Sequence, residues 1–163
     1  MAPSRPRSGR PLGMNADGVV SAFRVPASQQ SLAFVRSATA CVLGRSGWPA
    51  ADVGRILLAC GEAVQNAIEH GSPEGGEVRV ELVVTPRCAR LRVIDQGVGG
   101  PPPACPAEPP PHSEPRGRGL LIMDGLSEKL GISRNGRGTA VAMRFERFRP
   151  RPLAAAAARR RAA

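Results

Sequence analysis

The sequence predicts an α/β fold in which amphipathic helices lie against one face of a sheet. Apolar residues recur every three or four positions over 28–43 and 49–70, the spacing of helices with one buried face. Apolar and polar residues alternate over 77–85, 89–95 and 139–145, the spacing of strands with one buried face. The chain has 163 residues, 42% of them hydrophobic, which suits one domain with a substantial core.

Charge and composition separate a middle segment from two basic tails. The formal net charge is +10, but basic and acidic residues nearly balance over 19–146, where we expect the folded domain. Residues 1–18 are rich in Pro, Gly, Ser and Arg and predict a disordered leader, and the Arg/Ala/Pro segment 147–163 predicts a disordered tail. Aromatic residues make up only 3% of the chain, so stacking platforms for nucleic acid are not expected.

Cysteine usage and hydropathy indicate the compartment. No stretch approaches the roughly 18 apolar residues of a membrane span, and no apolar run follows the first arginines as in a secretory signal. None of the four cysteines forms a Cys-x-x-Cys pair, so a zinc site is not expected. Cys41 and Cys60 fall on apolar helix faces and are interpreted as small core residues. We therefore expect a reduced, cytoplasmic protein with no membrane partner.

The first elements are a strand and a helix. Residues 19–25 alternate enough for a short strand, which Pro26 ends. Ser28 is a suitable N-cap for a helix that runs to about residue 43.

The second helix carries an unusual polar stripe. Pro49 suits its first turn and Gly71 its end. Glu62, Asn66 and His70 are spaced by four and share one face. A carboxylate beside an amide oxygen suits a magnesium–nucleotide site, since one accepts a proton and the other holds a hard cation. The alternatives are a merely solvated face and a His70 that closes the helix by capping or packing. The opposite, core face is expected to hold Val53, Leu57, Cys60, Val64 and Ile68.

An inward-pointing carboxylate ends the strand 89–95. Asp95 continues the apolar face of this strand, and a buried carboxylate is costly unless specific donors meet it. The glycines that follow, Gly97 and Gly99, let the backbone approach a ligand closely. An Asp-x-Gly turn without a ligand remains the alternative.

A proline-rich loop and a glycine-rich helix start come next. Residues 101–115 hold eight prolines, which predicts no regular structure, and we expect a lid over about 96–118. Gly117 and Gly119 precede an apolar helix, whose free amides at that end suit phosphate. Simple helix-start glycines are the alternative.

The chain then predicts a hairpin. A strand over about 130–133 and the strand 139–145 flank Asn135-Gly136, a typical hairpin turn. Thr139 opens the last strand, either as a site residue or as an ordinary strand residue.

Four motifs occur in order, each in its expected element. Together they resemble those of the GHKL (histidine-kinase-like) ATPase superfamily. Their amino-acid sequences most resemble those of the small anti-sigma-factor serine/threonine kinases, and the resemblance covers about residues 19–146. The motifs are Glu62-x-x-x-Asn66, Asp95-x-Gly97-x-Gly99, Gly117-x-Gly119-Leu120 and Gly138-Thr139.

The resemblance implies a Bergerat-type ATP-binding fold: a two-layer α/β (α+β) sandwich with a mixed, mostly antiparallel sheet and helices on one face. It implies ATP and Mg²⁺ as ligands, Glu62 as the general base and Asn66 as the Mg²⁺ ligand. It implies that Asp95 accepts a hydrogen bond from the adenine amino group, supported by Thr139. The other implied nucleotide contacts are backbone or cationic ones, from Gly97, Gly99, Arg116, Gly117, Arg118, Gly119 and Leu120.

The resemblance also implies partners: a sigma factor, a STAS-domain antagonist phosphorylated on serine, and a second copy in a homodimer. Two features depart from the family pattern, the short proline-packed lid and the absence of a lysine for the phosphates, whose place arginine must take. A non-catalytic ATP-binding or protein-interaction module is the first alternative. A protein that binds nucleic acid through its arginine tails is the second, although no direct, specific nucleic-acid contact is expected.

Overall fold

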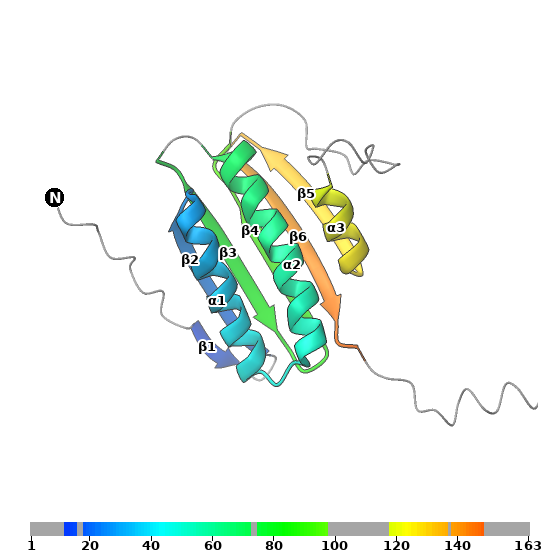
Figure 1. Cartoon of the computed structure of the whole chain (residues 1–163). Coiled ribbons are helices and arrows are strands. Elements are labelled where there is room, and N and C mark those ends of the chain that lie inside the picture. The colour runs from blue at the N-terminus through cyan, green and yellow to red at the C-terminus, as the bar shows by residue number, and fades with distance from the viewer. Residues whose placement is uncertain (1–11, 16–17, 73–74, 98–117, 137, 149–163) are drawn as a thin grey trace, which may run out of the picture.

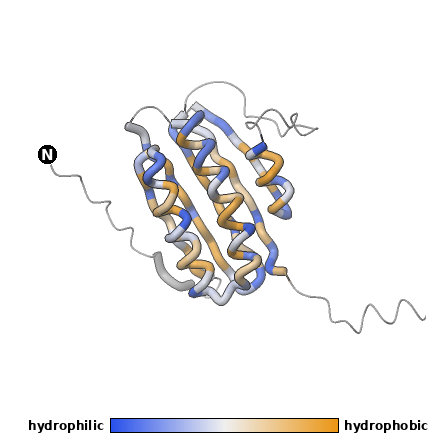
Figure 2. Tube along the Cα trace, viewed as in Figure 1, coloured by the Kyte–Doolittle hydropathy of each residue, from blue (hydrophilic) through white to orange (hydrophobic). Residues whose placement is uncertain are grey.

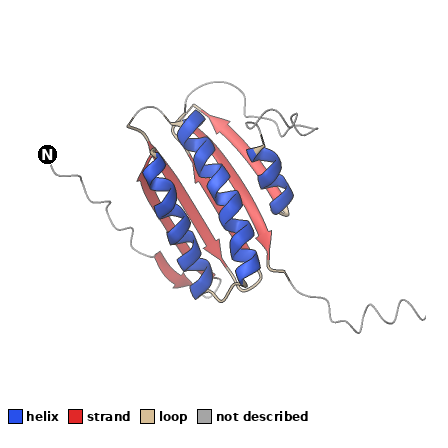
Figure 3. Cartoon of the chain, in the orientation of Figure 1, coloured by secondary structure: helices blue, strands red, loops and turns tan. Residues whose placement is uncertain are grey.

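The computed structural model describes residues 12–15, 18–72, 75–97, 118–136 and 138–148. Within them, a six-stranded sheet has the order β1-β2-β3-β4-β6-β5, and the helices cover one of its faces (Figures 1 and 3). The strands are β1 (Leu12–Asn15), β2 (Gly18–Pro26), β3 (Glu77–Val84), β4 (Cys88–Ile94), β5 (Lys129–Asn135) and β6 (Gly138–Glu146). The helical elements are α1 (Gln29–Arg45), α2 (Ala50–Asn66), the π-helical turn η1 (Ala67–Gly71) and α3 (Gly119–Leu126).

The two-layer sandwich is confirmed, with one correction. All described strand pairs are antiparallel, so the expected mixed sheet has no parallel pair here. The physical reason lies in the connections. β3–β4 and β5–β6 are neighbours joined directly, and the long helical connection from β2 to β3 also returns the chain antiparallel.

The strands bury one face each, as their alternation predicts. Every second residue of β3 and β4 is buried, and the inward positions of β6 are buried as well. The core between the sheet and the helices is mainly aliphatic, and in Figure 2 hydrophobic residues follow the central strands and the helices in front of them. The predicted inward residues of β6 are all buried: Thr139, Val141, Met143 and Phe145.

Two predictions near the start of the chain need correction. Leu12–Asn15 forms β1 on the edge of the sheet, so the disordered leader predicted for 1–18 is wrong for these four residues. A short segment can pair its backbone with β2 whatever its side chains are. Composition alone therefore did not predict this strand. Ser28 does occupy the N-cap position of α1, but its hydroxyl lies 3.2 Å from Ser31 Oγ and makes no capping bond to the backbone.

The buried face of α2 is broader than the predicted stripe. α2 lies between α1 and α3 and over the sheet (Figure 1), so three neighbours cover it. The centre of its buried arc is therefore shifted from the predicted one, and Val53, Leu57 and Ile68 are only partly buried. The fully buried apolar side chains of α2 are Ile56, Ala59, Cys60, Ala63 and Val64.

The cysteines differ from one another. Cys60 is a buried core residue, as predicted, but Cys41 is exposed, so its assignment to the core is wrong. Its helix α1 packs on the sheet from one side only, which leaves that flank in solvent. Burial raises the pKa of the Cys60 thiol from its ordinary value of 9.0 to about 11, although the nearby Thr39 hydroxyl opposes the shift. No helix in the described part of the chain is long and apolar enough to cross a membrane.

Candidate functional site

Asp95 is the buried polar centre of the candidate site. It follows β4 directly, is only 7% exposed, and hydrogen-bonds the first residues of β6. Its Oδ1 accepts from the backbone N–H of Gly97 at 2.9 Å and of Thr139 at 2.8 Å, and its own N–H donates to the Thr139 carbonyl at 2.9 Å. The described residues place no hydrogen bond on the other carboxylate oxygen, Oδ2. A carboxylate oxygen in that state, on a side chain that is otherwise buried, suits a donor from a ligand.

The Asp-x-Gly turn and the binding interpretation of Asp95 are therefore compatible. Gly97 closes the turn through Oδ1, while Thr139, 44 residues further along the chain, shares the same oxygen. Both hydrogen bonds hold the carboxylate in one orientation. A local Asp-x-Gly turn needs only the bond from Gly97, so the bond from Thr139 indicates a further role for Asp95.

Two glycines allow η1 to pack against this carboxylate. A side chain on Gly71 would overlap Asp95 Oδ2, and one on Gly97 would overlap the Gly71 carbonyl oxygen. The widened π-helical turn over Ala67–Gly71 delivers Gly71 to that position, and such turns are frequent at functional sites. Gly71, predicted only to end the helix, is thus part of the wall around Asp95.

A cavity of about 350 Å³ opens beside Asp95, between α2, η1, α3 and the β4–β6–β5 part of the sheet. Apolar side chains form most of its surface and a few polar groups converge on it, which is the composition of a small-molecule site. Its lining residues are Ala63, Asn66, Ala67, His70, Gly71, Val93, Asp95, Gly119, Leu120, Arg134, Thr139 and Val141.

Glu62 and Asn66 meet the start of α3. A Cβ built on Gly119, the first residue of α3, would lie 2.9 Å from Glu62 Oε2 and 3.3 Å from Asn66 Nδ2. The absence of a side chain at Gly119 therefore lets the helix start approach both polar groups. Asn66 lines the cavity, whereas Glu62, half-buried one turn earlier on α2, is not among the residues that line it.

The remaining predicted site residues divide into described and undescribed ones. Leu120 lines the cavity, and Arg118 occupies the N-cap position of α3. Gly99, Arg116 and Gly117, with most of the predicted lid, lie outside the described residues.

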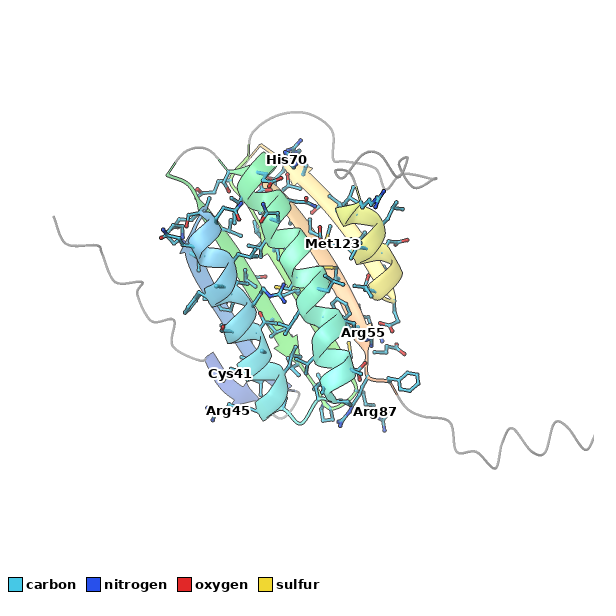
Figure 4. The ribbon with its side chains drawn as sticks, in the orientation of Figure 1. Cys41, Arg45, Arg55, His70, Arg87 and Met123 are labelled. Atoms are coloured by element: carbon cyan, nitrogen blue, oxygen red, sulfur yellow. The ribbon has the colours of Figure 1, made fainter. Side chains whose placement is uncertain are left out.

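Two cavity residues with ionisable side chains, Arg134 and His70, were not predicted as site residues. Arg134 on β5 lines the cavity, and its Nε–H donates to Thr139 Oγ1 at 2.8 Å. The available signal was its place in Leu130-x-Ile132-x-Arg134, where alternation expects an inward residue. His70 lies at the helix end that faces the cavity (Figure 4), but its side chain is 69% exposed, so it does not close the helix by packing.

The donor set fits a nucleotide with a cation held mainly by its phosphates. The described residues contain no group of three or more His, Cys, Asp or Glu side chains that would hold a metal alone. Asn66 offers one neutral oxygen, which suits Mg²⁺ when phosphates supply further ligands. The flat apolar walls and the available Asp95 oxygen suit a base with an amino group. These residues therefore fit both ATP and Mg²⁺.

Comparison with known proteins gives one family. The model of the histidine kinase-like ATPase domain matches residues 25–145. The anti-sigma F factor of Clostridium acetobutylicum is 30% identical over 99 residues, which are 57% of this chain and 69% of that protein.

One solved structure has the same fold. A structure of the RsbU and RsbW domains of Rv1364c from Mycobacterium tuberculosis superposes with a TM-score of 0.60 at 20% identity. The match covers 80% of this chain and 32% of that one, so this chain spans about a third of that protein's length.

Proposed function

Because this chain belongs to the histidine kinase-like ATPase domain family, we propose that it is an anti-sigma factor with protein serine/threonine kinase activity. In this proposal it binds Mg-ATP and transfers phosphate to a serine of a STAS-domain antagonist. The observation that carries the ATP site is Asp95, whose Oδ1 is fixed by two backbone donors while its side chain lines a largely apolar cavity. The similarity to an anti-sigma F factor supports the regulatory part.

The base-binding roles follow from the cavity. Asp95 accepts a hydrogen bond from the adenine amino group, and Thr139 supports this contact. The backbone at Gly97 and Gly99 lies against the base and ribose. Val93 and Val141 offer the apolar surface on which a flat ring rests.

The phosphate-binding roles gather at the start of α3. Asn66 gives its side-chain oxygen to Mg²⁺, and the helix start offers amides to the phosphates, where the helix dipole favours negative charge. Mg-ATP supplies the phosphoryl group and the charge neutralisation that phosphoryl transfer requires. The residues assigned to the phosphates are Arg116, Gly117, Arg118, Gly119 and Leu120.

Glu62 is the proposed general base. It lies against Gly119 and one helical turn from Asn66, so its carboxylate is close to the place assigned to the phosphates. There it accepts the proton of the attacking serine hydroxyl. General bases of this kind contribute about 10²- to 10⁴-fold to a rate.

The wider proposal concerns partners and organisation. We propose a sigma factor and a STAS-domain antagonist as partners, a homodimer, and a cytoplasmic location. We also propose 19–146 as the kinase domain, with a lid over about 96–118 and basic tails that make no specific nucleic-acid contact.

The test uses the full chain with Mg²⁺ and γ-labelled ATP. Calorimetry is expected to show ATP binding for the wild type and for Glu62→Gln. Phosphate transfer to a STAS-domain protein is expected to fall about 10²-fold or more in Glu62→Gln, and an antagonist with alanine at the target serine is expected to receive none. Glu81→Gln, on the sheet face away from the helices, is the matched control.

The outcomes separate the candidates. ATP binding without transfer to any STAS-domain protein tested would favour the non-catalytic module of the same fold. No ATP binding in the wild type would overturn the proposed function.

A further inference from the structure

Arg134 occupies an inward-facing position of β5, where the alternation of the strand predicts an apolar residue. β5 directs alternate residues toward the helices, and Leu130 and Ile132 pack against the core from these positions. Arg134 is the next inward residue, and it lines the cavity beside Asp95 and Thr139. A guanidinium in this half-buried place carries a desolvation cost that must be offset by specific contacts.

The contact that the sheet provides is a hydrogen bond to Thr139. The two residues face each other across the β5–β6 hairpin, which sets their register. The Arg134 Nε–H donates to Thr139 Oγ1 at 2.8 Å, and Thr139 is only 6% exposed. A threonine hydroxyl has one hydrogen and two lone pairs. Because Arg134 is always a donor, the hydroxyl hydrogen of Thr139 must point away from it.

The hydroxyl of Thr139 lies near the carboxylate of Asp95, a hydrogen-bond acceptor whose orientation is fixed. The Thr139 N–H donates to Asp95 Oδ1, and the Asp95 side chain lines the cavity. The wall therefore presents a carboxylate acceptor and, next to it, a hydroxyl that keeps its one hydrogen and one lone pair, with the hydrogen directed away from Arg134.

We propose that Arg134 is a positioning residue for nucleotide specificity, which keeps the Thr139 hydroxyl oriented as a hydrogen-bond donor beside the Asp95 acceptor. This inference rests on the proposed ATP-binding function. An acceptor beside a donor complements the amino group and N1 of adenine, directly or through one water. Guanine presents the reverse order, an acceptor at O6 and a donor at N1, and is disfavoured.

The expected size of the effect follows from the rotation of the hydroxyl. Such a torsion has about three staggered positions. Excluding the one that points at Arg134 strengthens a bond to N1 by about 1.5-fold, and holding a single position strengthens it by about threefold. The charge of Arg134 attracts the phosphates of any nucleotide equally. Only the ratio between nucleotides that differ at N1 therefore reports the positioning role.

The experiment compares ATP with 1-deaza-ATP, which lacks the N1 acceptor, by calorimetry on the full chain. The wild type is expected to bind ATP about five- to tenfold more tightly than 1-deaza-ATP, the value of one hydrogen bond of this kind. In Arg134→Met this ratio is expected to fall about 1.5- to 3-fold. In the Thr139→Val background, where the hydroxyl is absent, Arg134→Met is expected to leave the ratio unchanged. Arg90→Met, on the other face of the sheet, controls for the lost charge, and Arg134→Leu replaces Arg134→Met should the latter not fold.

The outcomes distinguish this inference from the proposed function. A wild type that binds neither nucleotide would overturn both. A wild type that prefers ATP with the same ratio in Arg134→Met would overturn the inference alone, and so would a change of ratio that persists in the Thr139→Val background.

Discussion

The exchange of Asp95 for asparagine changes one atom at the cavity wall and keeps the shape. The side-chain oxygen of asparagine can still accept from the backbone N–H groups of Gly97 and Thr139, which hold Oδ1 in the wild type. The amide nitrogen then takes the place of Oδ2. A donor thus replaces the acceptor that we assign to the adenine amino group.

The magnitude follows from that replacement. A hydrogen bond to a charged group contributes about 1.5–3 kcal/mol, so ATP affinity is expected to fall by about 10- to 150-fold. The fold keeps both backbone bonds, so the free energy of unfolding is expected to change by only about 1 kcal/mol. Asp95→Ala differs, because it leaves two buried N–H groups unpaired at a cost of about 1–3 kcal/mol each.

Calorimetry with Mg-ATP and urea unfolding measure the two effects separately. Asp124→Asn is the matched control, since Asp124 is exposed on α3 and undergoes the same chemical change. If Asp95→Asn bound ATP as tightly as the wild type, the assignment of the cavity to adenine would be wrong.

Three further predictions concern neighbouring parts of the molecule. Gly71→Ala is expected to push against Asp95 Oδ2, to cost about 1–3 kcal/mol of stability and to weaken ATP binding in calorimetry. Gly54→Ala, where the added methyl meets nothing, is expected to stabilise α2 by about 0.5–1 kcal/mol in the same urea assay; equal effects of the two substitutions would contradict the packing argument. Arg55→Ala removes the 2.9 Å cationic partner of Asp52, which is 2% exposed and keeps the Phe148 N–H as its other donor. Urea unfolding is expected to show a loss of about 1.5–3 kcal/mol, whereas an unchanged midpoint would show that Asp52 needs no cation. The Cys60 thiol, whose pKa is raised to about 11, is expected to resist a thiol reagent at pH 8 until urea unfolds the chain. Since the folded state holds this proton more tightly than the unfolded one, the contribution of Cys60 to stability is present below about pH 9 and is lost as the pH rises towards 11.

Local patterns in the sequence predicted the layers well. The alternation in β3, β4 and β6 correctly predicted their buried faces, because a strand's side-chain period depends only on backbone geometry. Glu62-x-x-x-Asn66 correctly placed both residues on one helix face for the same kind of reason. Predictions that depended on which neighbour covers an element succeeded less well, as Cys41, His70 and β1 show.

Local sequence patterns were sufficient to predict the elements other than β1 and η1, the inward direction of Asp95 and the order of the four motifs. How these segments contact one another follows only from the three-dimensional packing. The contact of Gly71 with Asp95 joins the end of η1 to the end of β4, and the contact of Arg134 with Thr139 orients a hydroxyl at the same wall. These contacts depend on the packing of a widened helical turn and on hairpin register. Such contacts cannot be predicted from short-range periodicity, because they join segments whose distance from each other in space is set by the whole sheet.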